Sequence, residues 1–200
     1  MASSVEIVNS ALTKLGAKRI MDLSDTQKEA REMNAIFELR RDYLLRTYNW
    51  SFAMKRASLS ALVTTPEWGY TLEYQLPTDC LRVVQVNDYW DVPGYADYLN
   101  SPDEEMYRIE GRTIRTNLGA PLKLRYLRKV TNSGEFDAAF NEVFACDLAF
   151  NCAEALTQSN SKKESAREDR REAVMMAVRS NAIELPPQML PDSSWVLSRR

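Results

Sequence analysis

The side chains that most often carry out catalysis in proteins are scarce in this sequence. It contains no histidine, and its three cysteines, Cys80, Cys146 and Cys152, include no pair with CxxC spacing. Without histidine, a Ser-His-Asp or Cys-His mechanism is excluded, and a zinc site lacks its usual ligands. The odd number of cysteines argues against a disulfide framework. We therefore predict three small buried thiols in a reducing compartment, with no metal and no cofactor.

Carboxylates are the remaining candidates for acid–base chemistry. Three pairs have the residue types that a glycan hydrolase uses, namely Glu104–Glu105, Glu135–Asp137 and Asp147–Glu154. Nothing in the sequence sets their spacing or environment, and each has an ordinary structural explanation in a loop or a helix. Asp147 stands out because its helical segment is otherwise apolar, and we expect it to be a hydrogen-bonded structural residue. We predict no catalytic residue, with a glycan hydrolase as the alternative.

Phosphate-binding features are equally weak. The chain has six glycines and no GxxxxGK[ST] loop, so nucleotide hydrolysis is not predicted. The net charge of −2 excludes DNA binding by bulk charge. A local basic cluster is present at Arg112, Arg115, Lys123, Arg125, Arg128 and Lys129. We interpret it as a solvated or subunit-contact face, and a DNA-binding protein stays as a further alternative.

Helical periodicity at both ends of the chain predicts four helices. The first begins at a capping box of Ser3 and Glu6 and stops at Gly16. A second capping box, Ser24 with Gln27, opens a helix that runs to about Tyr48. A third, strongly apolar helix covers residues 136–156. The last is capped by Ser161 and Glu164, and its thin apolar stripe comprises Ala166, Ala173, Met176, Ala177 and Ile183.

Between the two helical parts, alternation and turn signals predict strands. Trp50, Phe52 and Met54 alternate with small residues, and Leu76-Pro77-Thr78-Asp79 is a corner at which a strand must end. A hairpin turns at Glu110-Gly111-Arg112, and a half-buried strand follows from Leu122. In that strand Leu122, Leu124 and Tyr126 are expected to face the core, with Lys123, Arg125 and Leu127 on the other face.

Together these elements predict an α+β fold. Residues 1–49 and 135–183 form a four-helix-type bundle, residues 50–134 a small inserted antiparallel β domain, and residues 184–200 an extended C-terminal docking tail. No apolar run reaches the length of a membrane span, and the N-terminus is not a secretory signal. We expect a protein made in the cytoplasm, with no membrane partner.

Six segments, taken in order, resemble the tail tubular protein A family of phage head-to-tail adaptors, also called connector or gatekeeper subunits. They are IVNSALTKLGAKRI, RTYNW, WSFAMKRASL, YQLPTDCLRVVQV, YRIEGRTIRT with PLKLRYLRKVT, and FDAAFNEVFACDLAFNCAEALTQS. The resemblance implies a structural virion protein without catalytic residues. It implies a homododecameric ring between the portal protein and the downstream tail or nozzle component, with DNA passing through the lumen and retained in the head.

Three contact surfaces are expected on this basis. The tail would dock on the portal, or fold back on its own domain, through Met189, Leu190, Trp195, Val196 and Leu197. The loop at residues 88–103 would contact the downstream component through Tyr89, Trp90, Tyr95 and Tyr98. The last helix would pair with the second helix of a neighbouring subunit through Arg167, Glu168, Arg170, Arg171 and Glu172.

Overall fold

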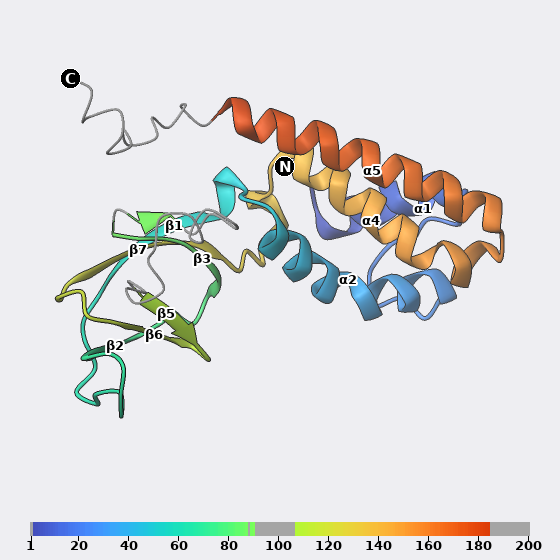
Figure 1. The fold of residues 1–200 in the computed structure, drawn as a ribbon. Helices are drawn as coiled ribbons and strands as arrows, with labels where there is room; N and C mark the ends of the chain where they lie inside the picture. Colours follow the sequence, from blue (N-terminus) through green and yellow to red (C-terminus); the bar gives the residue numbers. More distant parts are fainter. Residues whose placement is uncertain (1, 88, 91–106, 185–200) are drawn as a thin grey trace, which may run out of the picture.

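The computed structural model describes residues 2–87, 89–90 and 107–184 (Figure 1). The predicted α+β class is confirmed, because two helices precede the strands and two follow them. The helices occupy one end of the molecule and the strands the other. Among the described helices, none combines the length and the apolar content that crossing a bilayer requires.

The N-terminal cap predicted from the sequence is present in the first helix but not in the second. Helix α1 (Ser4–Leu15) has the predicted capping box and ends at Gly16, whose φ of 67° suits glycine. Helix α2 (Lys28–Thr47) begins after Gln27 without a side-chain cap, so the capping box predicted at Ser24 is wrong. Ser24 instead donates both its N–H and its hydroxyl to Asp22, because a local turn satisfies those groups first.

Helix α4 (Ala138–Thr157) is the centre of the helical part. Asp137 caps it by accepting a hydrogen bond from the Ala139 N–H, and α1, α2 and α5 all pack against it. Helix α5 (Asn160–Ile183) is capped by Ser159, two residues before the predicted cap at Ser161. Its buried residues are only Ala166 and Ala177. Met176 and Ile183, expected on its buried stripe, are exposed instead.

The strands form two antiparallel sheets. The larger sheet has the order β1-β7-β3-β4, with strands Met54–Leu59, Leu122–Arg128, Cys80–Val86 and Tyr89–Trp90. The smaller has the order β2-β6-β5, with strands Leu72–Gln75, Thr113–Thr116 and Tyr107–Glu110. The predicted corner and hairpin are both present. The strand predicted through Trp50 and Phe52 is wrong, because Ser51–Ala53 is a 3₁₀ turn that leads from α2 into β1.

Two apolar cores meet at the larger sheet. One lies between the sheets and includes Tyr74, Val83, Ile114, Leu124 and Tyr126. The other is helical, and residues of β3 and β7 join it from the opposite face of the sheet, namely Val84 and Leu127. Leu127, expected on the solvent face, is fully buried. The period-2 pattern fails at this end of β7 because helices cover the second face of the sheet.

Candidate functional site

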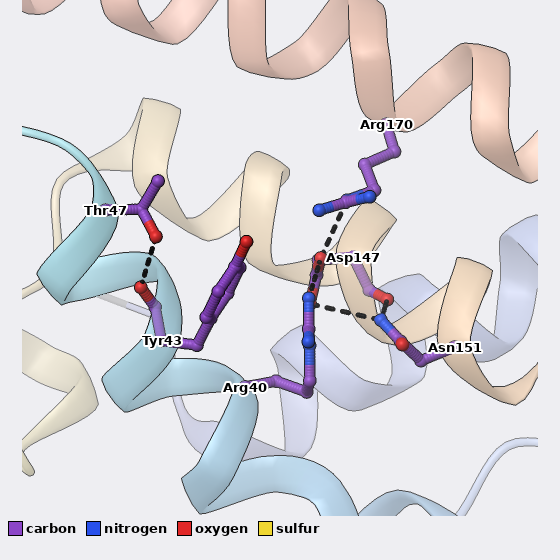
Figure 2. Close-up of polar contacts among 6 residues, drawn as sticks. All are labelled: Arg40, Tyr43, Thr47, Asp147, Asn151 and Arg170. Atoms are coloured by element: carbon purple, nitrogen blue, oxygen red, sulfur yellow. Dashed lines mark hydrogen bonds and ion pairs between the residues drawn. The ribbon is translucent and has the colours of Figure 1, made fainter.

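The most concentrated group of buried charges surrounds Asp147 in the middle of α4. Its side chain is fully buried. Arg40 on α2 donates from Nε to Oδ2 at 2.6 Å and from Nη2 to Oδ1 at 2.7 Å. From the other side, Nε of Arg170 on α5 lies 2.7 Å from Oδ1, an ionic contact without an aligned N–H (Figure 2). Asn151, one turn along α4, donates to Oδ2 at 3.3 Å. We call these three charged residues the α4 clamp.

The α4 clamp stabilises a carboxylate that would otherwise be costly to bury. A buried carboxylate is costly unless it is paired and hydrogen-bonded, and a bidentate guanidinium meets both needs. The hydrogen bond to Asp147 raises the pKa of Arg40 above its usual value, although partial burial opposes the rise. Aromatic rings complete the surroundings, with the Arg40 guanidinium 4.5 Å from the Tyr43 ring centre and that of Arg170 5.4 Å from the Phe150 ring centre.

Chemically, the α4 clamp is a structural ionic centre. Both oxygens of Asp147 are occupied by groups of the same chain, and the residue has no exposed surface on which a substrate could sit. Its effect is to join three helices through one residue. The prediction that Asp147 is a hydrogen-bonded structural residue is therefore confirmed.

The other carboxylates proposed for acid–base chemistry also have structural partners where they are described. Glu135 pairs with Arg128, and Asp137 caps α4. These two line a shallow hollow of about 420 Å³ together with Ser51, Phe52, Phe136, Asn181 and Glu184. Glu154 lies 2.5 Å from Lys163. Glu104 and Glu105 lie outside the described residues.

The Leu-Pro-Thr-Asp corner is held by a second polar group. Asp79 accepts hydrogen bonds from the Tyr126 hydroxyl at 2.9 Å and from Lys55 Nζ at 2.8 Å. Its carbonyl accepts from the Lys129 N–H at 2.7 Å. Burial alone would raise the pKa of Asp79, but the hydrogen bonds from Lys55 and Tyr126, with the charge of Lys55, outweigh it and lower the pKa below its usual value of 3.8. Asp79 therefore ties the corner to β1 and β7.

The three cysteines are free and buried, which confirms the prediction of structural thiols. Desolvation raises the pKa of Cys80 and of Cys146 to about 11 and that of Cys152 to about 12. They are protonated near neutral pH and are poor nucleophiles. Within the described ranges, no three His, Cys, Asp or Glu residues gather in a way that could hold a metal ion.

The predicted contact residues fall into three groups. On α5, the side chains of Arg167, Glu168, Arg171 and Glu172 are exposed. Arg170 instead points inward, and its guanidinium pairs with Asp147 of the same chain. Tyr89 and Trp90 form β4, at an edge of the larger sheet. The remaining ones lie outside the described residues: Tyr95, Tyr98, Met189, Leu190, Trp195, Val196 and Leu197.

Sequence reasoning missed the exposed apolar side chains. They occur on α2 at Leu39 and Tyr43, on β5 at Ile109 and on α5 at Met175, Met176, Val178 and Ile183. Others lie on loops, at Met21 between α1 and α2 and at Leu62, Val63 and Trp68 between β1 and β2. The signal was present in α5, whose apolar residues near the C-terminal end extend around more than one face. Assigning them to a single buried stripe hid the second face.

No known family model and no curated protein sequence matches this chain.

Proposed function

We propose that the chain is a structural virion protein, a head-to-tail adaptor subunit that forms a ring between the portal and the downstream tail components. The observation that carries the proposal is that the buried charges are paired within the chain, whereas many apolar side chains are exposed. The buried charge on α4 is paired with arginines from two other helices of the same chain, while apolar side chains on several helices, loops and one strand face outward. A contiguous group of exposed apolar side chains, such as Met175, Met176 and Val178 on α5, is typical of a protein–protein contact site.

A ring requires each subunit to present two different, complementary faces. We infer that the four helices act as a bundle that carries these faces, with α4 as its axis. The inserted β domain at residues 50–134 and the tail at residues 184–200 would then be free to contact other virion components. This organisation fits the family resemblance seen in the sequence, which implies a dodecamer.

In this proposal the tail docks on the portal and residues 88–103 contact the downstream tail or nozzle protein. DNA passes through the lumen, and the small net charge of −2 suits a channel that does not hold it, since affinity for DNA grows with the number of phosphates neutralised. The protein would reside at the head–tail junction of the virion after synthesis in the host cytoplasm.

The test combines purified protein with purified portal and images the mixture by electron microscopy. We expect a closed ring on one face of the portal. A matched variant that ends at residue 184 should remain folded by circular dichroism and fail to dock. The proposal is refuted if the full chain leaves portals bare, or if it degrades a cell-wall or capsule glycan in a zymogram. A salt-dependent gel shift with DNA would instead favour a head-completion factor.

A further inference from the structure

The outward face of α5 near its C-terminal end is apolar. Met176 is 63% exposed and Ile183 is 80% exposed, and Met175 and Val178 lie on the same outer side. The helix cannot roll to bury them, because it is fixed on its inner side at two points. Arg170 contacts Asp147, and Asn181 accepts from the Ser51 N–H at 2.9 Å and donates to the Asn49 carbonyl at 2.6 Å. This α5 face therefore lacks a cover among the described residues.

A second, different apolar face lies on α2. Leu39 is 74% exposed, and Ala35 and Tyr43 lie one turn before and after it. Residues four apart share one side of a helix, so these three form a stripe. The opposite side of α2 carries Met33, Phe37 and Leu44, which are buried in the helical core. Because its opposite side is buried in the core, α2 cannot rotate to bury this stripe, and the stripe stays exposed like the α5 face.

The two faces have matching positions in the molecule. Each helix packs mainly on α4, and both run from the far end of the helical part toward the strands (Figure 1). On α5 the exposed apolar residues occupy the later part and charged residues the earlier part, whereas on α2 charged residues lie along the whole helix. Because the two helices run in the same direction, a copy placed alongside by a small rotation would set α5 of one copy along α2 of the next.

Charges beside the two faces are complementary. Glu38, beside the α2 stripe, is 75% exposed, and its nearest cation is Arg41 at 3.8 Å. Arg41 is engaged more closely by Asp42, at 2.9 Å. Arg179 is the charged residue within the apolar part of α5, is exposed, and forms no ion pair with any described residue. An anion on one face and a cation on the other favour contact between the two faces.

We propose that the α5 face of one copy packs against the α2 stripe of a second copy, with Arg179 facing Glu38. The inference rests on the proposed function, since it names the two faces that a ring would use. Because the faces differ, the contact is heterologous, and repeating it generates a ring when the rotation closes. The occupant is a second copy of this chain, and the portal and the tail component then bind elsewhere.

Disulfide trapping tests this pairing in the full chain. In L39C/M176C the new thiols sit on two different helices of each subunit, so rings assembled on portals should yield a ladder of covalent multimers on a non-reducing gel. The native cysteines are buried and do not compete. V63C/M176C is the matched control, because Val63 is fully exposed on the loop between β1 and β2, and it should give no ladder.

Charge reversal gives an independent readout. We expect E38R and R179E each to weaken self-association about tenfold in analytical ultracentrifugation, and the double variant to recover most of it. A double variant no better than either single one overturns the pairing. Rapid maleimide labelling of M176C in the monomer and slow labelling in the ring are also expected. Slow labelling in both states means that the chain's own tail covers α5, which overturns the inference.

The outcomes separate the two proposals. Rings seen on portals without a ladder from L39C/M176C refute the interface and leave the adaptor function standing. The absence of any ring on portals refutes the adaptor function, and the interface with it.

Discussion

Replacing Asp147 by Asn tests whether the α4 clamp stabilises the helical part. The amide has nearly the same shape as the carboxylate but carries no charge, and its NH₂ group would face guanidinium donors. Arg40 would lose one of its two hydrogen bonds to a charged acceptor, and Arg170 would lose its ionic contact. Because the side chain keeps its shape, the effect reports the lost charge and the lost hydrogen bond together rather than a change in packing.

The magnitude follows from burial. Breaking a buried ion pair by removing one partner typically costs about 3–5 kcal/mol. The side chains of Arg40 and Arg170 are 23% and 29% exposed, so water recovers part of that cost. We therefore expect a loss at the lower end of the range, about 3 kcal/mol in the free energy of unfolding. With a urea m-value of about 2 kcal/mol/M, the unfolding midpoint should fall by about 1.5 M.

Urea unfolding at pH 7, followed by far-ultraviolet circular dichroism and tryptophan fluorescence, measures this shift. Glu154→Gln is the control, because it removes an exposed partner of Lys163 and should leave the midpoint unchanged. A triple variant, D147L with R40M and R170M, should regain most of the lost stability, since apolar groups can replace a whole buried ionic group. A fall of less than about 0.5 M for Asp147→Asn would refute the structural role that we assign.

Two further predictions concern titration. Because the pKa of Asp79 is lower in the folded chain than its ordinary value of 3.8, its stabilising effect should be complete above about pH 5 and lost as pH falls through the folded-state pKa. The stability difference between wild type and D79N, measured by urea unfolding from pH 3 to pH 7, should shrink below about pH 4, and a difference that grows there would contradict the assignment. The three thiols, with pKa values raised to about 11, 11 and 12, should react with Ellman's reagent at pH 8 only after denaturation. Rapid reaction of any of them in the native chain would show that it is not buried.

The sequence was most informative for features that form between residues a few positions apart, such as helix caps and turns. The capping box at Ser3 and the stop at Gly16 involve neighbouring residues, as do the corner at Pro77 and the hairpin at Gly111, and all four are present. Local signals failed where a competing local partner existed, as at Ser24, whose hydroxyl bonds to Asp22. The α+β class followed from the order of these elements.

The candidate site was only partly accessible from sequence. The apolar surroundings of Asp147 indicated a structural carboxylate, but they did not identify its partners. Arg40 is 107 positions away along the chain, and Arg170 lies on another helix in a run of similar charges. Sequence reasoning placed Arg170 with Arg167 and Arg171 at a subunit contact, since nothing local distinguishes an inward arginine from its neighbours.

By itself, then, the sequence determined the element types, their order, the lack of histidine chemistry and the thiol character of the cysteines, because these depend on composition and on short-range hydrogen bonding. Tertiary structure decided which faces are covered. Helices bury Leu127 from the second side of the sheet, and fixing α5 at Arg170 and Asn181 turns Met176 and Ile183 outward. Periodicity records that a residue is apolar, but only the packing of distant segments decides whether another element of the same chain lies against it.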